Sequence, residues 1–274
     1  MTRKLFLTDL DGTLLDDDKQ ISPPTRQVLE KWTKAGHIFA FGTGRALTSA
    51  LAIRQALGLE KLCRYLVCYN GVQIYDALEK KMIFETGIRQ ETVLKIMDLA
   101  ESLNVHCHTY QGPYIVARRE TQALKDYGVH IHMPVIFSET IIEQLVMPPC
   151  LLLAIERQEP EKLKTLQQAL KEQFSDEVTS YFSSSEYLDI LPAGVNKGKA
   201  LSTLASHLEI PIEDTVAAGD EENDISMVEA AGFGIAMKNG TERIRALADM
   251  ITEEDNCHDG LATALRQLLA SYEQ

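Results

Sequence analysis

Two aspartates separated by one residue give this sequence its first chemical signal. Asp9 and Asp11 follow the apolar run Leu5–Leu7 and stand directly before Gly12. The run predicts a buried strand, and alternate side chains of a strand share one face, so two carboxylates there would repel each other. If a turn at Gly12 separated them and a divalent cation neutralised them, one could attack phosphorus while the other transferred a proton. The fragment alone equally allows a solvated strand end with an Asp-Gly turn.

Three further segments place polar groups at the ends of predicted strands or the starts of predicted helices. Residues 41–45 read Phe-Gly-Thr-Gly-Arg, residues 195–199 read Val-Asn-Lys-Gly-Lys, and residues 219–224 read Gly-Asp-Glu-Glu-Asn-Asp. They supply a hydroxyl, a lysine and a group of acids in that order. Each segment alone is a weak signal, whereas the complete set in order, with a large insertion between the second and third motifs, is specific.

Together these four segments resemble the motifs of the haloacid dehalogenase-like hydrolases, in particular the Cof-type, sugar-phosphatase-like subgroup. The resemblance extends over essentially the whole chain, from Asp9 to Asp259-Gly260. It implies a Mg²⁺-dependent phosphatase that hydrolyses small phosphomonoesters, such as sugar phosphates, through an aspartyl-phosphate intermediate. The related transport ATPases carry threonine at the position of Asp11 and need membrane spans.

The resemblance implies a role for individual residues. Asp9 would be the nucleophile, and Asp11 would protonate the leaving group and then take a proton from water. Lys197 would stabilise negative charge in the transition state. We assign this role to Lys197 rather than Lys199 because the family pattern places the functional lysine before Gly198.

The same resemblance implies a phosphate site and a metal site. The phosphate-binding groups would be the Leu10 and Gly44 main-chain N–H groups and the side chains of Thr43, Lys197 and Asn223. Mg²⁺, which prefers oxygen ligands, would be held by the Asp9 carboxylate, the Asp11 main-chain carbonyl and the Asp220 carboxylate. Asp224 would lie close by as an indirect or occasional ligand. Each site has a structural alternative. Thr43 could be a capping residue in a tight turn, and Asp220 and Asp224 could be acids favoured at a helix start by the helix dipole. Arg45 would orient nearby acids or the substrate, or form a surface salt bridge.

Strand and helix signals alternate at both ends of the chain. Apolar runs predict strands near 5–9, 38–42 and 65–69, and a Ser-Pro pair at 22–23 predicts the start of a helix. The fold class is therefore α/β, with a doubly wound, parallel-sheet, Rossmann-like core. Ligands of such sheets bind at the carboxyl ends of the strands, which is where three of the candidates fall: Asp9, Thr43 and Asp220.

The middle of the chain has a different pattern. Residues 85–190 predict an inserted α+β cap with a largely antiparallel sheet, whereas residues 1–84 and 191–274 predict the catalytic core. A cap would cover the leaving group and set substrate specificity. The candidate residues for this role are His106, His108, Tyr110, Tyr114, Arg118, Arg119 and Tyr187.

Two pairs of histidines in the insertion need separate consideration. His106 and His108, and likewise His130 and His132, would each share one face of a predicted strand. Four such ligands could bind zinc. We favour the simpler interpretation that these are exposed or substrate-facing side chains.

Composition limits the functional classes. The chain has 274 residues, a formal net charge of -13 and five cysteines without a C-x-x-C pair. This charge argues against binding to nucleic acid or acidic membranes, and the cysteine pattern fits reduced thiols. The sequence has neither a signal-peptide core nor a long apolar span, so we expect a cytoplasmic protein. We also expect a monomer or homodimer that acts on a small phosphorylated metabolite.

Two other functions remain open. A phosphomutase would return the phosphoryl group to the substrate rather than to water, and it would require a bisphosphate activator. A sensor of phosphorylated ligands would bind tightly with weak turnover. A dehalogenase fits less well, because carbon–halogen cleavage needs no Mg²⁺ site.

Overall fold

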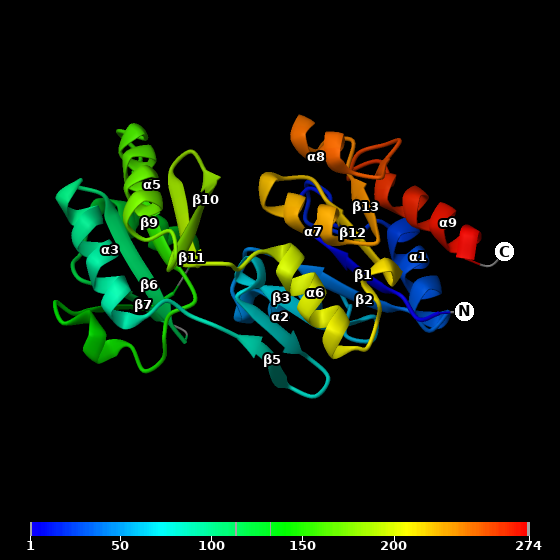
Figure 1. Cartoon of the computed structure of the whole chain (residues 1–274), viewed down its shortest axis with the longest axis horizontal. Helices are drawn as coiled ribbons and strands as arrows, with labels where there is room; N and C mark the ends of the chain where they lie inside the picture. The colour runs from blue at the N-terminus through cyan, green and yellow to red at the C-terminus, as the bar shows by residue number, and fades with distance from the viewer. Residues whose placement is uncertain (1, 113, 132, 273–274) are drawn as a thin grey trace. The chain divides into compact units, whose positions relative to one another are not determined.

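The computed structural model describes residues 2–112, 114–131 and 133–272. The chain forms two compact units (Figure 1). The core unit consists of Met1–Glu85 and Asn196–Gln274, and the inserted unit consists of Thr86–Val195. In the described part of the chain, no helix combines the length and the apolar character needed to cross a membrane.

The core unit is built on an eight-stranded sheet. Its strands, in spatial order, are β14 (Met250–Ile251), β13 (Phe233–Ala236), β12 (Thr215–Gly219), β1 (Leu5–Thr8), β2 (Ile38–Gly42), β3 (Cys63–Cys68), β4 (Gln73–Asp76) and β5 (Lys81–Glu85). The strands from β14 to β3 are parallel, and β4 and β5 add an antiparallel edge. The central strand β1 pairs Leu5 with Ile38 on one side and with Thr215 on the other.

Helices cover both faces of this sheet, as the doubly wound prediction requires. The helices of the core unit are α1 (Pro23–Lys34), α2 (Leu47–Ala56), α6 (Lys197–His207), α7 (Ile225–Ala230), α8 (Glu242–Leu247) and α9 (Gly260–Tyr272). On one face, Phe6 packs with Trp32 of α1 and Leu265 of α9, and these two helices lie side by side (Figure 1). On the other face, Leu7 packs with Leu204 of α6. Alternate residues of β1 therefore face opposite helical layers.

Sequence signals explain where the first helix begins. The Ser22 hydroxyl accepts a hydrogen bond from the Thr25 N–H, and Pro23 occupies the first turn. Both features satisfy or remove N–H groups that have no partner within the helix.

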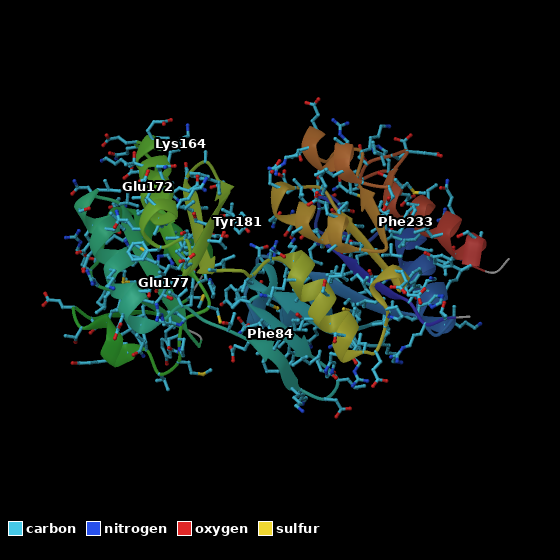
Figure 2. The ribbon with its side chains drawn as sticks, in the orientation of Figure 1. Phe84, Lys164, Glu172, Glu177, Tyr181 and Phe233 are labelled. Atoms are coloured by element: carbon cyan, nitrogen blue, oxygen red, sulfur yellow. The ribbon has the colours of Figure 1, made fainter. Side chains whose placement is uncertain are left out.

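The inserted unit contains a second, six-stranded sheet. Its strands, in spatial order, are β10 (Val178–Ser184), β11 (Tyr187–Pro192), β9 (Leu152–Ile155), β6 (His106–Gln111), β7 (Tyr114–Ala117) and β8 (Val135–Phe137). All neighbours are antiparallel except β7 and β8. The helices α3 (Gln90–Ser102) and α5 (Glu161–Gln173) contribute to one hydrophobic cluster with the sheet. Leu163 and Leu166 of α5 lie in that cluster, whereas Lys164 and Glu172 are exposed (Figure 2).

One predicted strand of the insertion is wrong. The structure has a helix, α4 (Gln122–Ile131), where a strand was expected at 130–132, and His132 lies outside the described residues. The Thr121 hydroxyl caps this helix by accepting from the Leu124 N–H, and Leu124 is buried against the sheet. The helix N-cap and the apolar helix face thus determine the structure here, despite the alternating histidines in the sequence. The premise of a second pair of histidines on one strand face does not hold.

Candidate functional site

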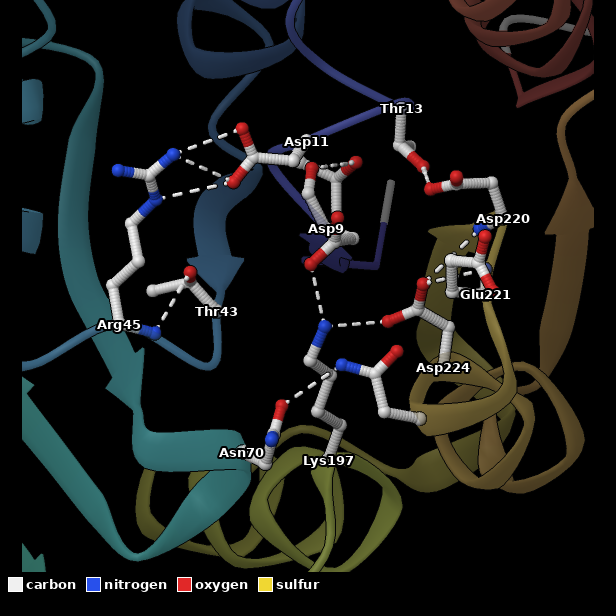
Figure 3. Close-up of polar contacts among 12 residues, drawn as sticks. Asp9, Asp11, Thr13, Thr43, Arg45, Asn70, Lys197, Asp220, Glu221 and Asp224 are labelled. Atoms are coloured by element: carbon white, nitrogen blue, oxygen red, sulfur yellow. Dashed lines mark hydrogen bonds and ion pairs between the residues drawn. The ribbon is translucent and has the colours of Figure 1, made fainter. Parts of the chain in front are cut away.

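The parallel register brings three polar segments to one edge of the core sheet. Asp9 directly follows β1, Thr43 follows β2, and Asp220 follows β12. Because β1 lies between the other two strands, these residues lie close together at the carboxyl ends. Lys197, the first residue of α6, enters the same region (Figure 3).

A fully buried lysine connects two of the acids. The Lys197 Nζ lies 2.5 Å from Asp9 Oδ1 and 2.5 Å from Asp224 Oδ1, as Figure 3 shows. The second oxygen of Asp224 accepts hydrogen bonds from the main-chain N–H groups of Asp220 and Glu221, both at 3.1 Å. Asp224 is therefore fixed from two directions, and it in turn fixes the ammonium against Asp9.

The carboxylates of Asp9, Asp220 and Asp224 have too little positive charge near them to balance their own. Burial raises the pKa of Asp9 to about 8, and the charge of Asp224 adds to the rise while Lys197 opposes it. Burial also raises the pKa of Asp220 to about 7, against the hydrogen bond from Thr13. Although burial disfavours its charge, the Lys197 pKa stays above its usual value because Asp224 and Asp9 surround it. The lysine is thus charged, and it does not compensate all of its neighbours.

A divalent cation would supply the missing positive charge. Oxygen atoms of Asp9, Asp220 and Asp224 all lie within 4.8 Å of one another. Three carboxylates facing the single ammonium of Lys197 leave two negative charges, which is the charge that Mg²⁺ would balance, and carboxylate oxygens are ligands that it prefers. Because both oxygens of Asp224 already accept hydrogen bonds, Asp9 and Asp220 are better placed to hold the ion. The Asp11 carbonyl stays a prediction as a third ligand.

The turn after Asp11 has to be glycine. Gly12 has a φ of +81°, and a Cβ atom there would lie 2.3 Å from Asp220 Oδ2. Next to it, the Thr13 hydroxyl donates to Asp220 Oδ1 at 2.6 Å. The Asp-Gly turn thus brings the first segment directly against the acid of β12, which a larger residue would push away.

Asp11 lies in a different environment from Asp9. Arg45 forms a two-pronged contact with its carboxylate, at 2.9 to 3.1 Å, and Lys19 Nζ lies 2.9 Å from Asp11 Oδ1. Burial would raise the pKa of Asp11, but the hydrogen bonds and charges of Lys19 and Arg45 outweigh it and lower that pKa. The side chains of Arg45 and Asp11 are each 39% exposed, so this ion pair fits both predicted roles of Arg45, the orientation of a nearby acid and a surface salt bridge.

The predicted phosphate-binding groups come from several segments at this edge of the sheet: Leu10 follows β1, Thr43 and Gly44 follow β2, and Asn223 follows β12. The Thr43 hydroxyl accepts from the Arg45 N–H at 3.2 Å, so its own proton is available for donation to another group. Asn223 donates to the Asn70 side chain at 3.0 Å, and Gly44 lies against that same Asn70 side chain. Leu10 is buried in the turn after β1.

Sequence reasoning missed three residues that contact this site. Lys19 pairs with Asp11, Thr13 binds Asp220, and the buried Asn70 binds Asn223. A signal existed for Thr13, which completes the Asp-Leu-Asp-Gly-Thr run, and for Asn70, which with Gly71 forms an Asn-Gly pair directly after the predicted strand at 65–69. Asn70 has a φ of 54°, a conformation that asparagine tolerates better than most residues. Lys19 had no local signal, because it reaches Asp11 from the following loop.

Comparison with known proteins agrees with this geometry. The family model for haloacid dehalogenase-like hydrolases matches residues 6–265. An HMP-PP phosphatase of Serratia proteamaculans is 29% identical, over 93% of this chain and 90% of its own length. A 5-amino-6-(5-phospho-D-ribitylamino)uracil phosphatase of Bacillus subtilis is 28% identical, over 96% of both chains. A crystal structure from Thermotoga maritima matches with a TM-score of 0.82 and 31% identity, over 97% of both chains.

The family match spans nearly the whole chain, including the four motifs from which the resemblance was drawn. The solved structure confirms the fold class, because its similarity extends over both units. The chain belongs to the haloacid dehalogenase-like hydrolases and is an enzyme of the phosphatase class.

Proposed function

We propose that this enzyme is a Mg²⁺-dependent phosphatase of small phosphomonoesters that forms an aspartyl-phosphate on Asp9. The observation that carries the proposal is the buried contact of Asp9 with Lys197, which itself is held by Asp224. A carboxylate attacks phosphorus well only where its orientation is fixed and the charge of the incoming phosphoryl group is compensated. Lys197 meets both needs, because it fixes one Asp9 oxygen and carries the compensating charge.

The other side chains have roles in the same reaction. The Thr43 hydroxyl and the Gly44 and Leu10 main-chain N–H groups would donate to phosphoryl oxygens, and the Asn223 amide would do so from the opposite side. When bound between Asp9 and Asp220, Mg²⁺ would neutralise charge on the phosphoryl group. Thr13 keeps Asp220 oriented for that contact.

Asp11 is the proposed acid and base, and its contacts define its resting state. Its lowered pKa means that it is ionised while Arg45 and Lys19 hold it. An ionised Asp11 is ready to accept a proton from the water that attacks the aspartyl-phosphate. To protonate the leaving group it must first take up a proton, which requires that its contacts with the two cations loosen.

The inserted unit is the proposed cap that selects the substrate. The two relatives carry different substrates in their names, HMP-PP and 5-amino-6-(5-phospho-D-ribitylamino)uracil. We therefore propose a class, small phosphorylated metabolites, rather than one compound. Sugar phosphates belong to this class, as the sequence resemblance implied.

Hydrolysis of p-nitrophenyl phosphate tests the proposal. Wild-type enzyme should hydrolyse it with Mg²⁺, lose activity with EDTA and regain it when Mg²⁺ is restored. Asp9→Asn should abolish turnover and the acid-stable label that the wild type acquires from ³²P-labelled substrate. Asp18→Asn is the matched control, because it makes the same carboxylate-to-amide change at an exposed position of the same segment.

Three results would overturn the proposal. Activity that survives Asp9→Asn would remove the nucleophile from that position. Tight binding of phosphorylated metabolites by a wild type without turnover would instead favour the sensor, and dependence on a bisphosphate activator would favour the phosphomutase.

A further inference from the structure

A second cavity lies within the inserted unit and shares no residue with the candidate site. It has a volume of about 290 Å³, close to the lower end of small-molecule sites at about 300 Å³. Its wall comes from the end of α3, the start of β6, the segment after β7, the start of α4 and the segment after β9. The proposed phosphatase reaction does not use it.

The strand register places this cavity at the end of β9 opposite both chain connections of the inserted unit. The chain enters beside the start of β9, where the Ile88 N–H donates to the Pro149 carbonyl. It leaves after β11, whose Ile190 pairs with Leu152, again at the start of β9. Ile155, at the other end of β9, lines the cavity. The length of the strand therefore separates the cavity from the two connections.

Three arginines from two segments line this cavity. Arg118 donates to Asp98 at 2.6 Å, and Arg157 donates to the Tyr187 hydroxyl at 2.8 Å, so both guanidinium groups are anchored. Arg119 is 63% exposed, and the ion pair that the structure describes for it, with Glu101, is long at 3.8 Å. Arg119 can therefore turn toward a ligand at little cost, beside two guanidinium groups that are already fixed.

The same wall carries three carboxylates: Glu101, Asp126 and Glu156. With equal numbers of guanidinium and carboxylate groups, the wall favours neither a purely anionic nor a purely cationic ligand. A ligand that carries one charge of each sign would find a partner for both. One oxygen of Asp126 accepts from the Gln122 side chain at 2.7 Å, and the ion pair of its other oxygen with Arg157 is long, at 3.5 Å, so this second oxygen retains hydrogen-bonding capacity for such a ligand.

Apolar side chains complete the wall. Met97, Val105, Ala123 and Ile155 line the cavity between the charged groups. They would remove the aliphatic part of a ligand from water, which stabilises the complex in proportion to the apolar area buried.

We propose that this cavity binds a small zwitterion with an apolar body, the chemistry of a free aliphatic amino acid. The carboxylate is bound by Arg118 and Arg119, because a planar guanidinium matches the two oxygens of a carboxylate. The ammonium group is bound on the side of Asp126 and Glu156, and the aliphatic body contacts Ile155 and its apolar neighbours. The site would give the enzyme a ligand unrelated to its phosphorylated substrate.

Titration calorimetry on the full-length enzyme tests this proposal with free leucine, isoleucine, valine and methionine as probes. At least one should bind saturably, and its decarboxylated amine and its deaminated acid should each bind at least tenfold more weakly. Arg119→Gln should weaken binding at least tenfold, and Arg266→Gln, a change at an exposed arginine of α9, should leave it unchanged.

The outcome is independent of the phosphatase proposal. Asp9→Asn should bind the same probe with unchanged affinity, because it lies in the other unit. The proposal is overturned if none of the four amino acids binds saturably, or if Arg119→Gln binds as well as the wild type. Equal binding of the amine or the acid alone would also overturn it, because the site would then not select a zwitterion.

Discussion

Lys197 Nζ and Asp9 Oδ1 lie 2.5 Å apart, and the lysine side chain has no exposed surface. The two residues are 188 positions apart in the sequence, so this contact joins the two halves of the core unit. A buried ion pair of this kind adds little net stability compared with a well-packed apolar pair. Its value lies in presenting a fixed carboxylate beside a fixed positive charge.

Replacing Lys197 with methionine should harm both stability and turnover. Without the ammonium, the buried Asp9 and Asp224 lose their shared counter-charge, which should cost about 3–5 kcal/mol of unfolding free energy. Turnover should fall at least about 100-fold because the transition state loses one stabilising charge. Urea unfolding and p-nitrophenyl phosphate kinetics measure the two effects. Lys199→Met, two residues along the helix at an exposed position, should change neither.

The turn glycine should be needed for space as well as for conformation. Gly12→Ala forces a side chain into a φ of +81° and against Asp220, so we expect a loss of about 1–3 kcal/mol in stability and much weaker Mg²⁺ activation. Gly36→Ala imposes a similar φ of +87° with nothing within 4 Å of the new Cβ. It should therefore lose stability but keep Mg²⁺ activation. If both variants respond alike to Mg²⁺, the contact with Asp220 is not important.

Removing Arg45 should change the titration of Asp11. Lys19 and Arg45 together hold the pKa of Asp11 below its usual value, so Arg45→Gln should move it upward. Carboxyl-carbon NMR titration of ¹³C-labelled enzyme would detect the shift directly. Because Asp11 must be ionised to accept a proton from water, the acidic limb of the rate profile should move to higher pH. Arg266→Gln supplies a control without contact to Asp11.

Acid should destabilise the inserted unit through His106. Burial lowers the pKa of His106 to about 4, well below its usual value of 6.5. The stability contributed by the neutral ring is fully present above about pH 6.5 and is lost as the pH falls toward 4. The shift corresponds to about 3 kcal/mol, since one pKa unit is about 1.4 kcal/mol.

Urea unfolding at pH 7, 5 and 4 measures this loss, and His106→Asn should reduce the difference between pH 7 and pH 4 by a similar amount. His207→Gln is the control, because this histidine is exposed in the core unit. An unchanged pH dependence in His106→Asn would exclude the ring as the source.

The sequence predicted the core well because its signals are local. Apolar runs, the Ser22 cap and glycine turns each act over a few residues, and the parallel sheet follows from their alternation. The lysine was assigned through the family pattern, and the structure shows its contact with Asp9. The pairing of Lys19 and Arg45 with Asp11 depended on loop geometry that no periodicity reports.

The insertion was harder to predict, because polar side chains on its sheet contact one another and these contacts leave no pattern in the sequence. His106 and His108 lie on one strand face as predicted, but both are buried rather than exposed. Their rings contact each other at 3.0 Å, and His108 contacts Tyr110 at 3.1 Å. The helix containing His130 was missed because the His-Ile-His sequence at 130–132 is typical of strand alternation. The strand β8 follows it and has only three residues, too few to show an alternating pattern.

The central position of β1 has a consequence for how the protein is made. β1 is synthesised long before β12, its neighbour on one side, which is completed only at Gly219. Every strand of the inserted unit, up to Pro192, is synthesised before then. The inserted unit can therefore form its sheet while one edge of β1 is still unpaired. An open apolar edge is a template for wrong partners, so nascent chains of this enzyme should depend on chaperones until β12 has been synthesised.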